Sequence, residues 1–235
     1  MYDNGFASVF LRISGVAYLI LMGDVLLAAF TAPVWLVAFL TPLDQSWAVL
    51  ALVAPLLAPA MGAAFVAFEA FVTDGSTAVV HSFVKGWLSL ARRTLPIGAA
   101  ASAAGVVIGV DLYALSGTSW GAAATPVFAL AGVLVLVTLI TAVAVMAVRP
   151  DITRVQALKV GLVFGVRGGL WSLVSLVVLG LFGWMLLQHP ALTLITAPAP
   201  VLFVVWFNAR RAITGWLDQG QPSAAGQRQE APCVG

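Results

Sequence analysis

Six long apolar runs dominate this sequence and limit what the chain can fold into. They cover residues 16–40, 47–72, 95–115, 122–148, 168–187 and 192–208. A helix needs about 20 apolar residues to cross the roughly 30 Å hydrocarbon layer of a bilayer. Only 9% of all residues are charged, whereas soluble domains carry roughly 25%. We therefore expect an all-α polytopic membrane bundle of six transmembrane helices.

The basic residues sort onto one side of this threading. All eleven lysines and arginines lie at the two chain ends, between runs two and three, or between runs four and five. The connecting segments 41–46, 116–121 and 188–191 contain none. Short basic loops stay on the cytoplasmic side of a membrane. The pattern therefore predicts a multi-pass protein with both termini in the cytoplasm.

The two ends of the chain differ from its middle. Residues 1–14 place Phe6, Val9, Phe10 and Ile13 at helical spacing, which predicts a short amphipathic helix on the inner leaflet. Residues 15–215 form the predicted transmembrane domain. The tail, residues 216–235, is polar and rich in Gly, Pro and Gln, so we expect it to be disordered. The single cysteine, Cys233, excludes a disulfide framework and a metal site built on paired cysteines.

Two segments on the predicted inner side match after a shift of 74 positions. In this match Lys85 corresponds to Lys159 and Arg93 to Arg167. The match predicts tandem hairpins, residues 47–115 and 122–187, in parallel orientation, as in some transporters. The alternative, that the two segments are similar without a duplication, stays open, because any basic amphipathic helix that precedes a span looks similar.

Small residues recur every three or four positions in two parts of the sequence. Small residues let membrane helices approach closely, because lipid provides no hydrophobic force between helices. We therefore predict packing seams, with pore lining as the less favoured alternative. The seam residues are Gly98, Ser102, Gly105 and Gly109 in run three, and Gly161, Gly165, Gly168 and Ser172 around the start of run five.

Three acidic residues are candidates for a substrate or proton site. Asp24 lies near the middle of run one, where a charged Asp costs about 2.5–3.5 kcal/mol. Such a residue faces the interior of a bundle. Asp24 is either a substrate or proton site, or a protonated or hydrogen-bonded contact between helices. Asp111 lies near the outer boundary, and Glu69 lies near the inner end of run two. We expect Glu69 to pair with Lys85, Arg92 or Arg93.

The remaining polar residues give no catalytic pattern. We predict an inner-face polar cluster of Lys85, Arg92, Arg93, Arg167 and Asn208. The two histidines, His81 and His189, fall on opposite sides of the membrane in this threading, so they share neither a metal nor a triad. The basic residues are spread along the chain rather than gathered in a nucleic-acid-binding patch. We therefore expect no enzymatic activity, metal, cofactor or nucleic-acid partner.

Several motifs along the chain resemble those of one protein family. They are FLRISGVAYLI at residues 10–20, a proline–alanine turn LAPAMGAA at 57–64, VDLYAL at 110–115, and VVWFNARR at 204–211. Together they resemble the YesL-like family of bacterial integral membrane proteins (domain of unknown function 624). The resemblance extends over roughly residues 5–215. Family members usually carry an asparagine close to the position of Asp24.

The resemblance implies a location and a context rather than a mechanism. Such proteins reside in the bacterial plasma (inner) membrane, and their genes often lie beside genes for carbohydrate uptake and polysaccharide degradation. We therefore expect a non-enzymatic accessory or regulatory component linked to carbohydrate uptake. Its expected partners are the lipid bilayer and a sugar transporter, another membrane protein or a second copy of the chain. Two alternatives stay open: a small secondary transporter or permease component, and a membrane scaffold that acts through its amphipathic helix.

Overall fold

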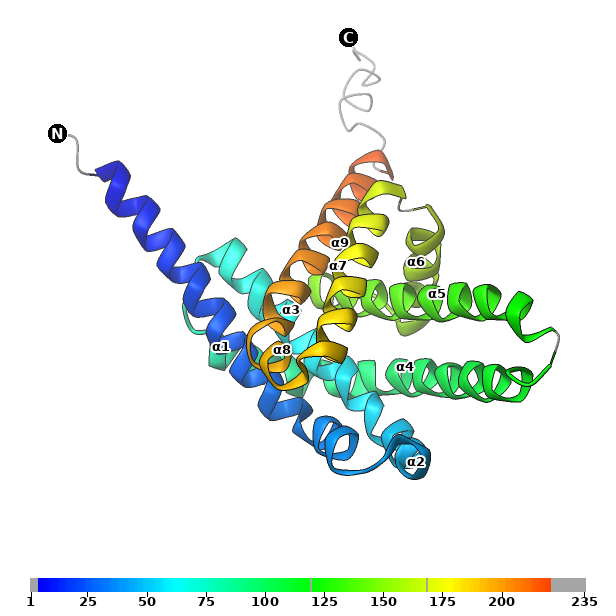
Figure 1. Ribbon diagram of the computed structural model, residues 1–235. Helices are drawn as coiled ribbons and strands as arrows, with labels where there is room; N and C mark the ends of the chain where they lie inside the picture. The colour runs from blue at the N-terminus through cyan, green and yellow to red at the C-terminus, as the bar shows by residue number, and fades with distance from the viewer. Residues whose placement is uncertain (1–3, 119, 168, 221–235) are drawn as a thin grey trace, which may run out of the picture.

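The computed structural model describes residues 4–118, 120–167 and 169–220, and its regular elements there are all helices (Figure 1). Side chains at 4–13, 43–45, 164–167, 169–173, 212–220 and a few single positions are not described. The all-α prediction is confirmed over this part of the chain. The elements are α1 (Asn4–Leu40), α2 (Leu43–Val53), η1 (Ala54–Leu56), α3 (Leu57–Asp74), α4 (Val79–Leu115), α5 (Gly121–Val148), α6 (Arg154–Arg167), α7 (Gly169–Gln188), α8 (Pro190–Thr196) and α9 (Pro198–Gly220).

Four helical segments are long and apolar enough to cross a membrane within the described residues. They correspond to the first four apolar runs of the sequence. Their bounds are Ser14–Leu40, Ser46–Asp74, Val79–Leu115 and Gly121–Val148. Runs five and six fall on α7 and on the pair α8–α9. The chain is thus a membrane protein with several candidate spans.

Both ends of the chain are more helical than the sequence predicted. α1 runs without a break from Asn4 to Leu40, so the segment 1–14 is not a separate helix where it is described. α9 continues to Gly220, which moves the predicted start of the disordered tail beyond residue 216. Residues 1–3 and 221–235 lie outside the described residues, so the disorder of the tail stays a prediction.

The second span is interrupted by a short 3₁₀ turn, η1, that contains Pro55. The interruption precedes LAPAMGAA, which is not a turn but the start of helix α3. A proline has no N–H, so the carbonyl four residues earlier loses its helical partner. For Pro55 that carbonyl belongs to Ala51, and the Ser102 hydroxyl of α4 donates a hydrogen bond to it at 2.7 Å. A tertiary contact therefore replaces the missing backbone bond.

The same replacement occurs in α4, a single helix of 37 residues that contains Pro96. The sequence predicted a separate inner helix before run three, but the two are continuous. Pro96 deprives the Arg92 carbonyl of its helical donor. The Arg154 guanidinium donates a hydrogen bond to this carbonyl, with Nη2 at 3.0 Å. α6 is thereby attached to the middle of α4.

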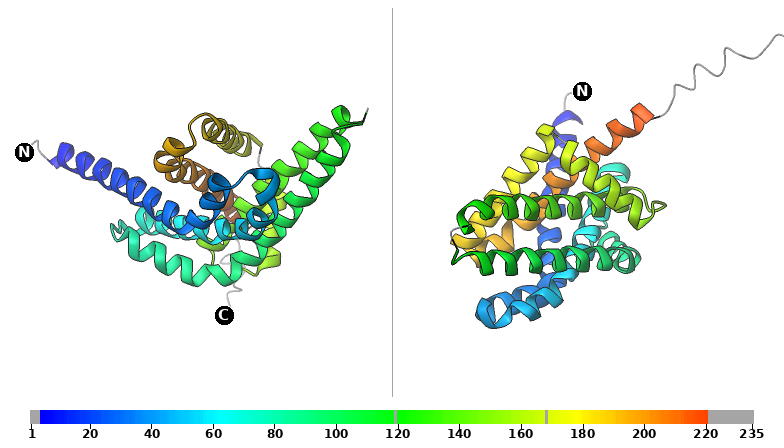
Figure 2. Two further views of the ribbon diagram at one scale, coloured as in Figure 1. Left: turned by 60° about the horizontal axis from the view of Figure 1, so that its bottom comes forward. Right: turned by 90° about the vertical axis from the view of Figure 1, so that its right-hand side faces the viewer.

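Helices α4 and α5 form a long hairpin that projects from the rest of the molecule (Figures 1 and 2). It crosses α7 and α9, which lie side by side. α6 folds back along α5, and Gly161 permits this approach, because a Cβ there would lie 2.7 Å from the Thr138 carbonyl oxygen. The other half of the hairpin base packs α4 against α3.

Aromatic side chains fill the core where α1, α3, α4 and α9 meet. Phe65, Phe68, Phe83 and Trp206 are fully buried. The ring of Phe68 contacts the ring of Trp206 at a centroid distance of 6.0 Å. α3 ends at Gly75, whose positive φ of 64° suits the left-handed position after a helix. This turn carries the chain from α3 into α4, so the two helices pack as a hairpin.

The predicted tandem hairpins are not alike in the structure. The inner segment before run three is part of α4, whereas the matching segment before run five is a separate helix, α6. α3 packs closely along α4, but α5 packs mainly against α6 and touches α7 little. An origin by duplication stays a prediction, because a difference in structure between the two hairpins does not decide whether they share an origin.

Only two of the four predicted seam residues of run three contact another helical element. A Cβ at Gly98 would lie 2.8 Å from Ala58 Cβ and from the Pro55 carbonyl oxygen, so α3 and α4 touch there. Ser102 bonds to Ala51 as described above. Gly105 and Gly109 have no neighbouring atom within 4 Å of a Cβ placed on them. The surroundings of Gly165, Gly168 and Ser172 lie outside the described residues.

The Ser102–Ala51 contact gives a testable prediction. Replacing Ser102→Ala leaves the Ala51 carbonyl without a donor, which costs about 1–3 kcal/mol of folding free energy. Pro55→Ala restores an N–H four residues after Ala51. We expect the cost of Ser102→Ala to shrink in the Pro55→Ala background, measured as thermal unfolding in detergent. Additive losses in the double variant would show that the proline and the serine act independently.

Candidate functional site

Asp24 of α1 contacts the first turn of α9. Its side chain is buried, and its Oδ1 accepts a hydrogen bond from the Ala199 N–H at 2.7 Å. Pro198 and Pro200 have no N–H, and the Val201 N–H already bonds to the Ala197 carbonyl at 3.1 Å. The first turn of α9 therefore offers one free donor, and Asp24 takes it.

This contact has the form of a helix cap supplied by a different helix. The first N–H groups of a helix lack partners, and a carboxylate beside them is stabilised by the positive end of the helix dipole. Close packing makes the contact reachable, because a Cβ on Gly23 would lie 3.2 Å from Ala199 Cβ. The structure thus shows the interhelix contact that the sequence left as one of two interpretations. A substrate or proton role for Asp24 stays a prediction.

Glu69 of α3 pairs with Arg210 of α9. Its Oε1 lies 3.0 Å from Arg210 Nη2, and it also accepts a hydrogen bond from the Thr73 hydroxyl at 3.1 Å. About a quarter of each charged side chain is exposed. The Arg210 guanidinium also lies over the ring of Trp206, 5.5 Å from its centroid. The predicted partners Lys85, Arg92 and Arg93 were wrong, because α9 and not α4 covers this side of α3.

The predicted inner-face cluster divides into two separate groups. Arg93 of α4 donates hydrogen bonds to the carbonyls of Pro150 and Ile152, the latter at 3.2 Å. Lys85 and Arg92 are exposed on the same helix. Asn208 instead is buried and donates to the Ser175 hydroxyl of α7 at 3.2 Å. The Arg167 side chain lies outside the described residues.

Asp111 lies apart from the other two acidic candidates. It is half-buried in the projecting arm of α4, four residues before that helix ends at Leu115. Asp24 contacts α9 and Glu69 contacts Arg210 in the main body of the molecule. The structure therefore does not assemble the three carboxylates into one site.

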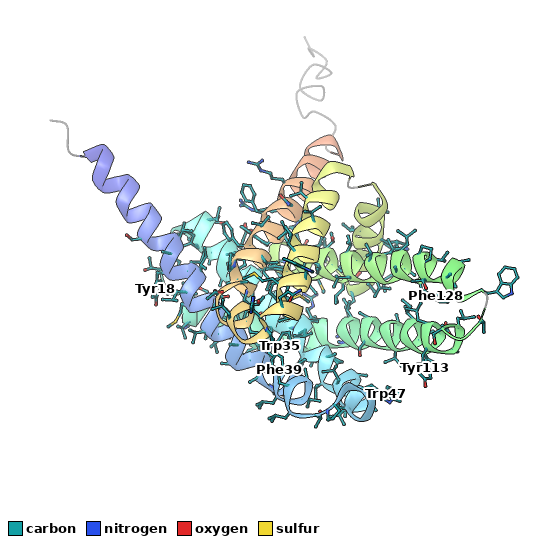
Figure 3. All side chains as sticks on the ribbon, in the orientation of Figure 1. Tyr18, Trp35, Phe39, Trp47, Tyr113 and Phe128 are labelled. Carbon is teal, nitrogen blue, oxygen red and sulfur yellow. The ribbon has the colours of Figure 1, made fainter. Side chains whose placement is uncertain are left out.

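An apolar groove of about 680 Å³ opens between α1, the base of the hairpin and α7–α9. Trp35 and Phe39, near the C-terminal end of α1, line it, and their rings stack at a centroid distance of 6.1 Å (Figure 3). Gly98, Ser102 and Gly105 line the side that α4 provides. Of the two open positions in the predicted seam, Gly105 therefore faces this groove.

The polar side chains that line the groove are already hydrogen-bonded. Trp35 Nε1 donates to the Thr31 hydroxyl at 2.9 Å, and this hydroxyl donates to the Leu27 carbonyl at 2.6 Å. Ser102 is bonded to Ala51. A sugar needs free donors and acceptors to replace its lost water. The groove thus suits hydrocarbon rather than a polar solute.

Within the described residues, no three His, Cys, Asp or Glu side chains gather as metal ligands. The chemistry available to the described polar groups is hydrogen bonding and ion pairing between helices. Comparison with family models, curated proteins and solved structures finds no match to this chain. The functional argument therefore rests on the sequence and the geometry.

Sequence reasoning missed the partners of the candidate residues. Ala199 is apolar and gave no signal, although the alternation Pro198–Ala199–Pro200 marks the only first-turn residue there with a free N–H. The sequence placed Arg210 just after run six, on the predicted inner side, but indicated no partner for it. Ser102 was predicted as a small packing residue, whereas its hydroxyl repairs a proline break.

The Asp24 contact predicts different effects for two substitutions. Asp24→Asn keeps an oxygen that accepts the Ala199 N–H, whereas Asp24→Leu leaves this buried donor without a partner, at a cost of about 1–3 kcal/mol. We expect Asp24→Leu to lower the thermal stability in detergent clearly more than Asp24→Asn does. Equal losses would contradict the capping role.

The Glu69–Arg210 pair predicts a measurable coupling. Both groups are partly screened by solvent, so a double-mutant cycle of Glu69→Gln and Arg210→Gln should give about 1 kcal/mol or less, but not zero. Glu69→Gln combined with Arg92→Gln is the matched control and should give purely additive losses. A coupling in the control cycle, with none to Arg210, would restore the partner that the sequence predicted.

Proposed function

We propose that this chain is a six-span protein of the bacterial inner membrane that acts as a non-enzymatic accessory or regulatory component of carbohydrate uptake. One observation supports the non-enzymatic part: Asp24 and Asn208 are engaged in contacts between helices, and the polar side chains that line the groove are hydrogen-bonded. The link to carbohydrate rests on the sequence resemblance alone. The expected partner is a sugar transporter, another membrane protein or a second copy of the chain.

Helix lengths support two spans beyond the four described above. α7 has 20 residues, which extend for about 30 Å at 1.5 Å per residue. α8 and α9 return along α7 and bury Thr193, Ala199 and Trp206. These lengths therefore support a fifth and a sixth span.

Contacts between distant segments support the predicted orientation. Arg93 binds the α5–α6 turn, and Arg154 binds α4. The Glu69–Arg210 pair joins the end of α3 to α9. All of these residues come from segments that the distribution of lysine and arginine assigns to the cytoplasm. Both termini belong to the same side in this proposal.

A small transporter is the second candidate, because Asp24 is a buried carboxylate in the first span. Buried ionisable residues within membranes frequently serve proton or substrate pathways. The bond from Ala199 accounts for the burial of Asp24 without transport, so we favour the accessory role. The two candidates differ in whether the charge of Asp24 is essential.

Uptake measurements in a deletion strain test the proposal. We expect slower uptake of at least one sugar in a labelled panel, and co-purification of the tagged protein with a membrane transporter. Asp24→Asn should restore uptake to the wild-type level, because the amide preserves the contact with α9. Asp24→Leu is the matched variant. Because it lowers the stability of the protein, it should restore uptake only in proportion to the amount of protein that accumulates.

Two results would count against this function. Normal uptake of every sugar together with no co-purified membrane protein removes the accessory role. A stable Asp24→Asn protein that fails to restore uptake, and that abolishes flux shown by the wild type in liposomes, favours the transporter.

A further inference from the structure

Four arginines from distant parts of the sequence meet where α4 passes the turn between α5 and α6. Arg93 donates to the carbonyls of this turn, and Arg154 donates in the reverse direction to the Arg92 carbonyl. These reciprocal bonds fix the two segments against each other. The group, which we call the arginine cluster, consists of Arg92, Arg93, Arg149 and Arg154.

The charge of the arginine cluster is only partly balanced. Asp151 is the acidic residue in the turn, and its Oδ1 lies 3.4 Å from Arg149 Nε. Hydrogen bonds from its own backbone amide and from Arg149 lower the pKa of Asp151, with Arg93 adding to the effect. Asp151 is therefore ionised at neutral pH, and of the four arginines Arg149 and Arg93 act on it. The cluster remains strongly positive.

Two of the four arginines have a structural task, and the other two are exposed to a ligand, with Arg149 also paired to Asp151. Arg93 and Arg154 are bound to backbone carbonyls, including the carbonyl that Pro96 leaves free. Arg92 is exposed, and the Arg149 side chain is 45% exposed. The bonds of the first pair fix the two backbone segments that carry Arg92 and Arg149, which lowers the ordering cost of binding an anion there.

Apolar side chains are exposed beside these charges. Leu88 is 66% exposed and lies between Lys85 and Arg92 on one face of α4, at spacings of three and four residues. Val155, next to Arg154 on α6, is 62% exposed. Apolar groups next to basic ones on one face are typical of a surface at the boundary between acyl chains and headgroups.

The position along the chain agrees with this boundary. The candidate span of α5 ends at Val148, and Arg149 follows it directly. We propose that the arginine cluster binds the phosphate of an anionic phospholipid in the inner leaflet, with its acyl chains beside Leu88 and Val155. The choice of leaflet rests on the proposed orientation; the headgroup chemistry does not.

The guanidinium group suits this ligand. Its planar fork donates two parallel hydrogen bonds to phosphate oxygens. Basic pockets between membrane helices on the cytoplasmic side are known to hold anionic headgroups. A cluster that served only to orient the chain would need positive charge but no fixed geometry, and this cluster is fixed by three hydrogen bonds from Arg93 and Arg154.

Lipid binding to the purified, full-length protein tests the proposal. Phosphatidylglycerol and phosphatidylcholine of equal chain length are titrated into the detergent-solubilised protein, and bound lipid is counted by native mass spectrometry. We expect phosphatidylglycerol to bind more tightly, and Arg92→Gln and Arg149→Gln each to weaken it about fivefold. Arg211→Gln is the charge-matched control, because Arg211 lies on α9 with its guanidinium 4.4 Å from the Phe207 ring. It should leave the affinity within about twofold.

Each contrary result overturns the inference in a defined way. Equal binding of both lipids excludes recognition of the negative headgroup. Unchanged affinity in the folded Arg92→Gln/Arg149→Gln double variant, checked by its unfolding temperature, removes the site from the cluster. Displacement of phosphatidylglycerol by millimolar inorganic phosphate shows a free-phosphate site instead. Sugar uptake is not part of this test, so its result is independent of the proposed function.

Discussion

Hydrocarbon provides no hydrogen-bond partners, and the structure of this chain follows from that constraint. An unpaired backbone group in lipid costs several kcal/mol, so spanning segments adopt helices that pair their own groups. Prolines interrupt this pairing at Pro55 and Pro96. The structure answers each interruption with a side chain from another helix, Ser102 for the Ala51 carbonyl and Arg154 for the Arg92 carbonyl. The helix breaks thereby become contacts that hold α4 to its neighbours.

The same constraint explains the deepest acidic residue. Asp24 does not need a basic partner at its own depth, because the first turn of α9 presents a backbone donor whose proline neighbours have none. The carboxylate satisfies the helix end, and the helix end stabilises the carboxylate. Asp24, which the sequence presents as a candidate transport residue, is thus also explained by its contact with α9. The engagement of Asp24 with α9, and of the groove's polar side chains with their own helices, is the main reason to favour a protein that binds partners over one that conducts a polar solute.

The groove and the arginine cluster show how the two ends of the bundle differ. At one end, the groove between α1 and the α4–α5 hairpin has no free polar side chain in its lining. At the other end, charged side chains tie α3 to α9 and α4 to α6. Water and headgroups can solvate charge only at the ends of the spans, so ionic contacts gather there. The positions of Glu69 and Arg93 follow this rule, and Asp24 is the exception that backbone capping permits.

The sequence by itself determined the helical class and the apolar segments that could span a membrane, because hydropathy acts locally along each span. It predicted the first, second and fourth segments closely, whereas the third helix begins at Val79 rather than near residue 95. Only the tertiary structure decided the partners, because these depend on which helices cross. Asp24 and Ala199 are 175 positions apart, and Glu69 and Arg210 are 141 apart. Local patterns also gave no signal that α1 and α4 would continue as single helices, or that Gly105 would face a groove instead of a neighbouring helix. Those outcomes depend on how the helices pack, which cannot be read from local sequence patterns.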